Sequence, residues 1–216
     1  MNVAESRRPM SESERRLRAA LAHTHLETPR TMVSLGMPEM LGKLFDATLL
    51  ANLRPSAVLL PLIRRGDQLS MLLTVRSAKL RAHGGQIAFP GGARDASDIT
   101  AVDNALREAR EEVGLDPASV EVVGYLDDYP TLSRFRITPV VGIIDTEPEL
   151  AIDDNEVAEV FELPFEMITS RKHFVRKVLS RDGLIVPFFE LQWQQYRVWG
   201  ATAGMLWDLA GRMEQA

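Results

Sequence analysis

The sequence contains no cysteine and no long run of apolar residues. The lack of cysteine excludes disulfide bonds and catalysis by a thiolate. No apolar run approaches the ~20 residues that cross a bilayer as a helix. The N-terminal stretch MNVAESRRPMSESERR also lacks an apolar segment of signal-peptide length. We therefore expect a cytoplasmic protein that does not associate with membranes.

An excess of positive charge is also missing. The 25 Lys and Arg residues are outnumbered by 30 Asp and Glu residues, which gives a net charge of −5. This balance argues against a general nucleic-acid binder, because such proteins carry a basic face. An anionic small molecule would have to be attracted locally, by a few cations or by a bound metal.

The 216 residues are within the range of a single domain. We expect residues 1–30 to form an N-terminal arm and residues 31–216 to form one domain. Ser11 followed by Glu14 has the pattern of a capping box, which predicts a short helix to about His23. The sequence leaves open whether this helix packs on the domain or forms a loosely attached arm.

The remaining chain alternates apolar strand candidates with two well-separated helices. Arg64-Arg65-Gly66-Asp67 and Arg181-Asp182-Gly183 each join two apolar runs and predict two hairpins. The alternation favours an α+β fold in which a mixed sheet lies between helical layers, an α/β/α sandwich. The predicted strands cover residues 57–63, 69–75, 120–126, 135–144, 174–179 and 184–189, and the predicted helices cover 102–113 and 200–212.

Residues 84–115 carry the clearest chemical signal. Apolar residues at spacings of three and four give the helix in this stretch one buried stripe. Glu108, Glu111 and Glu112 lie close together on the remaining helix surface, where they repel one another. Gly114 predicts a left-handed stop at the C-terminus of the helix. In isolation, such a glutamate-rich face is more often solvated surface than a binding site.

The turn before this helix changes that interpretation. Two consecutive glycines, Gly91 and Gly92, let the backbone approach an ion or a phosphate closely. Mg²⁺ and Mn²⁺ prefer carboxylate and carbonyl oxygens as ligands. We therefore predict an Mg²⁺ or Mn²⁺ site. Its predicted ligands are the Gly92 carbonyl, Glu108, Glu111 and Glu112.

The segment from Arg107 to Leu115, together with Gly92, resembles the Nudix box. That pattern is Gly, five residues, Glu, seven residues, then Arg-Glu-apolar-any-Glu-Glu-any-Gly-apolar, and the second half matches without exception. In the first half, Asp98 stands where the family has Glu, and eight residues separate it from Arg107. We interpret Asp98 as a helix cap and leave it out of the ligand set. The resemblance implies the Nudix fold and metal-dependent hydrolysis of a diphosphate.

Residues 72–92, LLTVRSAKLRAHGGQIAFPGG, are similar to the signature of the coenzyme A pyrophosphatase branch of the Nudix hydrolases. The resemblance implies cleavage of coenzyme A or a derivative to 3′,5′-ADP and 4′-phosphopantetheine or its acyl form. The polar residues of this signature are interpreted either as substrate-binding residues or as ordinary solubilising residues. They are Arg76, Lys79, Arg81, His83 and Gln86.

Nudix enzymes often have a further carboxylate that faces the metal, and the resemblance places Glu156 at that position. We assign catalysis to Glu108, Glu111, Glu156 and Arg107. In this hypothesis one of the three glutamates deprotonates a water that attacks one phosphorus in line, while the metal neutralises charge on the diphosphate. The alternative for Glu156 is an ordinary loop acid beside other acids.

Two other functions stay open. The first is a Nudix hydrolase for another nucleoside diphosphate derivative, such as ADP-ribose, and the second is a non-catalytic Nudix-type nucleotide-binding module. A binding module has no need of three mutually repelling acids. Tyr129 is predicted either to stack on an adenine or to anchor its own loop. Trp199 and Met205 are expected in the core or at the interface of a homodimer, which is a further hypothesis.

Overall fold

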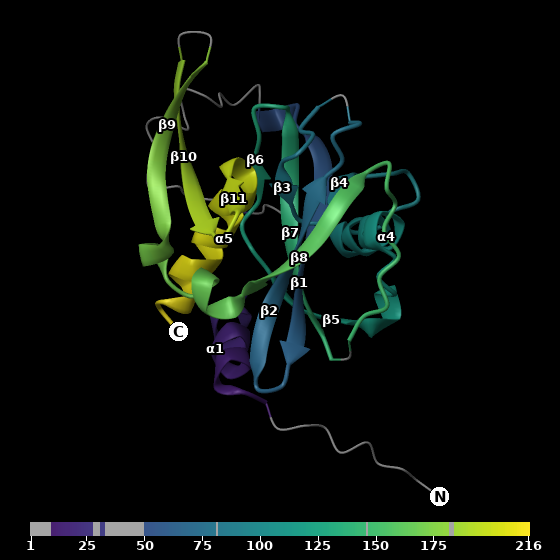
Figure 1. Cartoon of the computed structure of the whole chain (residues 1–216), viewed down its shortest axis with the longest axis vertical. Helices are drawn as coiled ribbons and strands as arrows, with labels where there is room; N and C mark the ends of the chain where they lie inside the picture. The colour runs from purple at the N-terminus through teal and green to yellow at the C-terminus, as the bar shows by residue number, and fades with distance from the viewer. Residues whose placement is uncertain (1–9, 28–30, 33–49, 81, 146, 182–183) are drawn as a thin grey trace, which may run out of the picture.

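The structure is a computed structural model of the 216-residue chain. It describes residues 10–27, 31–32, 50–80, 82–145, 147–181 and 184–216. A large mixed sheet forms its centre (Figure 1). Its main strands follow the order β3-β2-β1-β7-β5, in which β1 runs parallel to β7 and antiparallel to β2. The bounds are Arg54–Arg65 for β1, Gln68–Arg76 for β2, Ile87–Ala88 for β3, Val120–Tyr125 for β5 and Phe135–Ile144 for β7.

Three further strands extend this sheet from its main path. Strand β4 (Gly91–Ala93) pairs with β1, β6 (Tyr129–Pro130) pairs with β7, and β8 (Val157–Pro164) pairs with β2. The predicted hairpin at Arg64–Asp67 is confirmed, since Arg65 lies opposite Gln68 in the antiparallel register. Pairing of β4 with β1 brings the double glycine to the middle of the sheet.

Helices cover both faces of the central sheet (Figure 1). Helix α4 (Ala101–Val113) packs on one face, where Ala105, Ala109 and Val113 are buried against β1 and β7. Helices α1 (Glu12–Leu21) and α5 (Gly200–Met213) lie on the other face, in a second apolar cluster. The α/β/α arrangement with a mixed sheet predicted from the sequence is confirmed.

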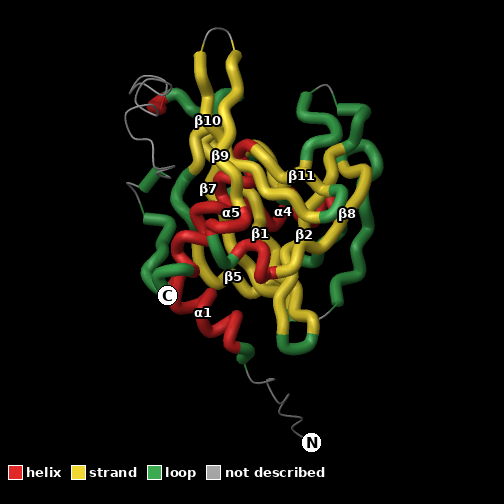
Figure 2. The backbone as a smooth tube through the Cα atoms, turned by 60° about the vertical axis from the view of Figure 1, so that its left-hand side comes forward, coloured by secondary structure: helices red, strands yellow, loops and turns green. Residues whose placement is uncertain are grey.

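A second, three-stranded sheet lies outside α5 and is built as a meander (Figure 2). It consists of β9 (Phe174–Arg181), β10 (Leu184–Trp193) and β11 (Tyr196–Trp199), and β9 and β10 form the predicted antiparallel hairpin. Phe189 of β10 stacks on Trp207 of α5. Short 3₁₀ turns complete the described elements at Pro117–Ser119, Phe165–Ile168 and Arg171–His173.

The start of α4 differs from the prediction. Thr100, and not Asp98, is the N-cap residue. Its hydroxyl accepts a hydrogen bond from the backbone N–H of Asp103, and the Asp103 carboxylate accepts one from the backbone N–H of Thr100. This complete capping box leaves no role in capping for Asp98. The C-terminal end is as predicted, because Gly114 adopts φ 71° and its N–H bonds to the last carbonyls of the helix.

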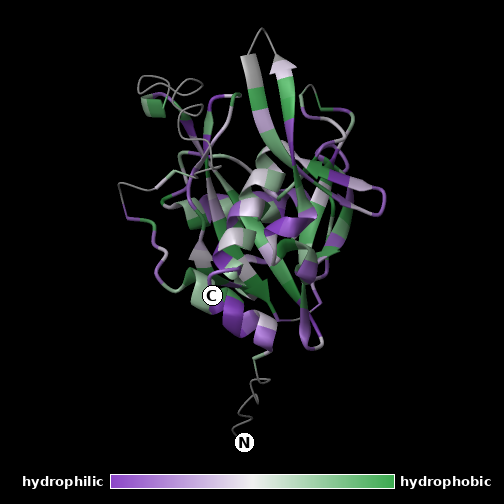
Figure 3. Cartoon of the chain, turned by 90° about the vertical axis from the view of Figure 1, so that its left-hand side faces the viewer, coloured by the Kyte–Doolittle hydropathy of each residue, from purple (hydrophilic) through white to green (hydrophobic). Residues whose placement is uncertain are grey.

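Helix α1 is anchored to the rest of the molecule. Ser11 caps it as predicted, but the carboxylate of Glu14 accepts hydrogen bonds from Arg18 and Arg64 and does not complete a capping box. Leu17 and Leu21 are fully buried in the same apolar cluster as α5. Figure 3 shows the hydrophilic outer face of this helix. Among the described helices, none is long and apolar enough to cross a membrane.

We expect Leu17→Ala to lower the free energy of unfolding by about 2–5 kcal/mol, because the substitution leaves a cavity in the core that α1 shares with α5. Urea denaturation followed by tryptophan fluorescence measures the change. Arg15→Ala, on the exposed face of the same helix, is the control and should shift the value by less than about 0.5 kcal/mol. An equally small effect of Leu17→Ala would show that α1 is a loosely attached arm.

Candidate active site

The double glycine lies directly on the acidic face of α4. Strand β1 pairs with β4 so that Ala57 lies opposite Gly92. A Cβ atom on Gly92 would come within 2.5 Å of Glu108 Oε2, and one on Gly91 would come within 2.5 Å of the Ala57 carbonyl oxygen. Only glycine therefore permits this approach of backbone and carboxylate. The Gly92 carbonyl accepts a hydrogen bond of 2.6 Å from the Ser56 hydroxyl.

Glu112 is the most buried acid of this helix, with a relative exposure of 2%. Its carboxylate accepts a hydrogen bond from the backbone N–H of Gly91 at 3.3 Å, and Arg76 approaches it at 3.4 Å. Burial, with a smaller contribution from the charges of Glu108 and Glu156, raises the pKa of Glu112 to about 7, against the opposing effects of Arg76 and the Gly91 N–H. Glu112 is thus a carboxylate held where its charge is poorly compensated.

Arg107 holds the other two glutamates of the helix. Its guanidinium donates to Glu108 at 2.9 Å and to Glu111 at 2.8 Å. Glu108 is nearly buried and Glu111 is mostly exposed. Burial raises the pKa of Glu108, and the charges of Glu111 and Glu156 add to this rise, although Arg107 opposes it.

Asp98 is the partner that fixes Arg107. Nε and Nη2 of Arg107 donate to the two carboxylate oxygens of Asp98, both at 3.0 Å. Asp98 also accepts a bond from the backbone N–H of Asp95, and the Arg107 pairing holds the pKa of Asp98 below its usual range. Such a two-point pairing orients the guanidinium plane. Asp98 therefore acts on the glutamates through Arg107, which accounts for its position two residues before the true helix cap.

Glu156 approaches the same region from the loop before β8. The loop is held by hydrogen bonds from the Glu156 N–H to the Asp153 carbonyl and from the Ser77 N–H to the Glu156 carbonyl. The exposed Glu156 carboxylate lies close enough to raise the pKa of both Glu108 and Glu112. The structure thus brings an acid from a distant part of the chain to the acidic face of α4.

No three His, Cys, Asp or Glu side chains within the described parts of the chain form a ready-made group around one metal position. Ion pairs explain this, because Arg107 and Arg76 hold the carboxylates. The donor set nevertheless fits a hard divalent cation. Carboxylate and carbonyl oxygens are its preferred ligands, and a cation beside Glu108 and Glu112 would compensate the buried charge whose burial raises their pKa values.

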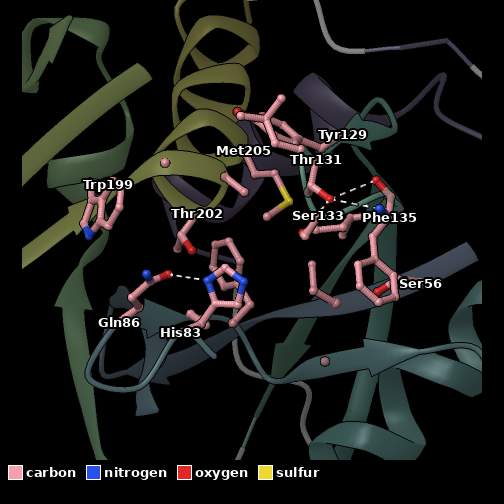
Figure 4. Close-up of a pocket in the computed structure, with 18 of the residues that line it drawn as sticks. Ser56, His83, Gln86, Tyr129, Thr131, Ser133, Phe135, Trp199, Thr202 and Met205 are labelled. Carbon is pink, nitrogen blue, oxygen red and sulfur yellow. Dashed lines mark hydrogen bonds between the residues drawn. The ribbon is translucent and has the colours of Figure 1, made fainter. Parts of the chain in front are cut away.

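A cavity of about 750 Å³ opens on the other side of the double glycine. Arg76, His83, Gln86, Gly91 and Gly92 are among its lining residues, so the predicted substrate residues Arg76, His83 and Gln86 share one space. Figure 4 shows His83 and Gln86 on one side of this cavity. The backbone of His83 has φ 61°, an unusual conformation for a residue other than glycine, and its Nδ1 lies 3.0 Å from Gln86 Oε1.

The remaining two predicted substrate residues lie elsewhere. Lys79 is exposed, its Nζ is 3.4 Å from the Asp154 carbonyl oxygen, and it is not among the residues that line the cavity. Arg81 lies outside the described residues. Of the two cations at Arg76 and Lys79 that the structure describes, only Arg76 lines the cavity, and it links the cavity with the acids.

Several cavity residues were missed by sequence reasoning. Trp199 and Met205, expected in the core or at an interface, both line the cavity, as does Thr202, which the sequence did not single out. Tyr129, predicted either to stack on an adenine or to anchor its loop, lines it too. The Thr202 hydroxyl donates to the Ile87 carbonyl at 2.9 Å, which ties the start of α5 to β3. The nearest sequence signal is Tyr196 with Val198, Trp199 and Gly200 before α5, which resembles the coenzyme A pyrophosphatase branch but does not by itself indicate a cavity.

We expect Glu112→Gln to stabilise the metal-free protein at pH 8. The pKa of Glu112, about 7 in the folded state against an ordinary 4.5, means that the burial penalty is absent below pH 4.5 and complete above pH 7. The free energy of unfolding in excess EDTA should therefore be roughly 2–3 kcal/mol higher for Glu112→Gln than for wild type at pH 8. The gain should fall below about 1 kcal/mol at pH 5.

Urea denaturation at the two pH values measures this difference. Glu111→Gln is the matched control, since the Glu111 carboxylate is mostly exposed, and it should change the stability by less than about 0.5 kcal/mol at either pH. A Glu112→Gln protein that is less stable than wild type at pH 8 would contradict the burial penalty on the Glu112 charge.

Comparison with known proteins identifies the family. The family model described as NUDIX domain matches residues 53–181. The uncharacterized Nudix hydrolase NudL from Citrobacter koseri is 43% identical over 159 residues, covering 74% of this chain and 82% of that protein. NudL from Escherichia coli K12 is 42% identical over the same length and coverage. The crystal structure of a MutT protein from Methanosarcina mazei Go1 aligns with 75% of this chain and 93% of its own at 16% identity, with a TM-score of 0.48.

The matched domain contains the double glycine, the whole of α4 and Glu156. The residues of the acid cluster therefore lie within the matched domain. By the domain match and by its relatives, the chain belongs to the Nudix hydrolase family.

Proposed function

We propose that the protein is an Mg²⁺- or Mn²⁺-dependent hydrolase that cleaves the diphosphate of coenzyme A or its derivatives to 3′,5′-ADP and 4′-phosphopantetheine. The observation that carries the proposal is the acid cluster of Glu108, Glu112 and Glu156 on one side of the double glycine, with a cavity on the other side. A small anionic molecule in the cavity would meet the acids at the glycines. We infer that the ligand is a small nucleotide diphosphate similar to coenzyme A. A cytoplasmic location and a homodimer remain predictions.

A divalent cation at this position would neutralise charge on the diphosphate oxygens and favour deprotonation of water. Gly92, Glu108, Glu111 and Glu112 would hold it, as the sequence predicted. The poor compensation of charge at Glu112 makes that carboxylate a strong candidate ligand, because its charged form gains most from a cation. Glu111 is the weakest member of the set, being largely exposed and paired with Arg107.

Neighbouring side chains would take the proton of the attacking water, position the carboxylates and bind the diphosphate. Glu156 is exposed, and its carboxylate makes no ion pair with any residue that the structure describes, whereas a guanidinium holds Glu108. We therefore favour Glu156 as the base that takes the proton of the attacking water. Arg107 would position Glu108 and Glu111. Arg76, between Glu112 and the cavity, would bind a diphosphate oxygen.

The choice of coenzyme A rests on the resemblance of residues 72–92 to the branch signature. Three of its polar residues, Arg76, His83 and Gln86, line the same cavity. A volume of about 750 Å³ is in the usual range for a site that takes a small organic ligand. Both facts support the proposal, and neither excludes another nucleoside diphosphate derivative.

Incubation of the purified protein with coenzyme A, ADP-ribose or NADH, in Mg²⁺ or Mn²⁺, tests the substrate. We expect 3′,5′-ADP and 4′-phosphopantetheine from coenzyme A, resolved by chromatography and mass spectrometry, and no products in excess EDTA. Faster turnover of ADP-ribose than of coenzyme A would replace the proposed substrate. Activity in excess EDTA would end the metal hypothesis.

We expect Glu112→Gln to lower the hydrolysis rate by roughly 10²-fold or more, because an amide is a weaker and uncharged ligand for a hard cation. The control is Glu149→Gln, the same chemical change at an exposed acid of the loop after β7, which should keep the wild-type rate. Urea denaturation of both variants shows whether they are folded. A folded Glu112→Gln protein with full activity would contradict the proposed role of the acid cluster.

A further inference from the structure

Strand β9 forms one edge of the second sheet. Its register with β10 runs from Phe174 to Arg181 without a bulge, and no other strand in the described ranges pairs with it. Figure 1 shows β9 on the outer side of this sheet. At the opposite edge, β11 packs against β3, and its Tyr196 stacks on Phe161 of β8. A long, regular edge strand offers its backbone N–H and C=O groups to a further strand.

Large apolar side chains are exposed on this strand. Val175, Val178 and Leu179 have relative exposures of 57%, 66% and 45%. They are three of the seven large apolar side chains that are exposed in the part of the chain that the structure describes. Single exposed apolar residues are normal on a protein surface, whereas several on one edge strand mark a surface that gains stability when it is covered.

The usual protection of an edge strand is weak in β9. Edge strands often carry charged residues, especially Lys, that prevent pairing with another chain. The Nζ atom of Lys177, however, lies 2.5 Å from Glu190 Oε1 on β10, and Glu190 also pairs with Arg197 of β11. The charge of Lys177 is therefore compensated within its own sheet, and its methylene stem can pack against apolar neighbours.

The charges of β9 select one antiparallel register for a second copy of the same strand. Residues that lie opposite each other share one face of the combined sheet, so the two-fold axis passes through a residue. An axis at Arg176 or Lys177 places like charges directly opposite each other, and an axis at Leu179 places Lys177 opposite Arg181. An axis at Val178 avoids all three of these pairs.

The register with its axis at Val178 also matches apolar surface with apolar surface. Val178, the most exposed of the three apolar side chains, meets Val178 of the second copy. Leu179 meets the stem of Lys177 of the second copy, and symmetry repeats this contact. Arg176 lies opposite Ser180, and the two Arg176 residues are about 14 Å apart along the strands, beyond the Debye length at physiological salt.

We propose that β9 is a homodimer interface, in which it pairs antiparallel with β9 of a second copy about an axis at Val178. The two three-stranded sheets then form one continuous sheet. Leu179 also lines the cavity together with Val186 and Phe188, so Lys177 of the second copy reaches the rim of the cavity through Leu179. This interface does not depend on the substrate or the reaction proposed above.

Cysteine cross-linking tests the register, because the chain has no cysteine of its own. Opposed residues in an antiparallel pair have Cα atoms about 5 Å apart, within reach of a disulfide. We expect Val178→Cys, oxidised mildly at low protein concentration, to give a covalent dimer on non-reducing gels that dithiothreitol reverses. Ile99→Cys, at an exposed apolar residue outside β9, is the matched control and should stay monomeric on the gel.

A mixed pair of variants makes the register test stricter. Arg176→Cys and Ser180→Cys should each cross-link little when oxidised alone, because each residue is about 14 Å from its own symmetry mate. Mixed before oxidation, the two variants should form the disulfide between unlike chains. Equal cross-linking of the mixture and of the separate variants would overturn the inference, as would a Val178→Cys protein that reacts no faster than Ile99→Cys.

Sedimentation velocity over a dilution series measures the association without cross-linking. We expect wild type to dimerise, and Val178→Asp to raise the dissociation constant at least about 10-fold, because it places two carboxylates opposite each other at the axis. Ile99→Asp makes a matching change outside β9 and should associate as wild type does, and circular dichroism shows whether both variants are folded.

Two results of the sedimentation series would overturn the inference. The first is a wild type that stays monomeric throughout, as expected if another segment of the chain or a different protein covers β9. The second is a dimer that a folded Val178→Asp variant leaves unchanged, because the interface would then lie on another surface.

Discussion

The burial of negative charge on the acidic face of α4 is the constraint on which the site depends. Glu112 is almost completely enclosed, and Glu108 and Glu156 lie near enough to raise its pKa further. Two guanidinium groups offset part of this charge, Arg76 from β2 and Arg107 from α4 itself. A cluster that is destabilising without a cation is expected where function, and not stability, requires the charge.

The surrounding fold serves to keep these acids in place. Pairing of β4 with β1 presses Gly92 onto Glu108, and a side chain at either glycine would prevent this approach. Asp98 fixes Arg107 by two hydrogen bonds, so the guanidinium that orients Glu108 is itself oriented. The same two glycines form a wall of the cavity. The backbone of Gly91 and Gly92 thus contacts both the acidic face of α4 and the cavity.

Local patterns in the sequence predicted the parts of this arrangement that depend on neighbouring residues. The stripe of α4, its stop at Gly114 and the hairpin at Arg64–Asp67 follow from spacing and turn chemistry. Asp98 was misinterpreted as a cap because Thr100 and Asp103 compete for that role two residues later. The cavity could not be predicted, since strands of both sheets and α5 meet there, and only the tertiary fold brings Tyr129 to Gly204.

Calorimetric titration of Mn²⁺ into the protein at pH 6 and pH 8, each in two buffers of different ionisation enthalpy, tests the central claim most directly. Because the pKa of Glu112 is about 7, the account predicts that Mn²⁺ displaces close to one proton at pH 6 and almost none at pH 8, with tighter binding at pH 8. Glu112→Gln should abolish the proton release. Mn²⁺ binding that is independent of pH and releases no proton, or no binding at either pH, would contradict it.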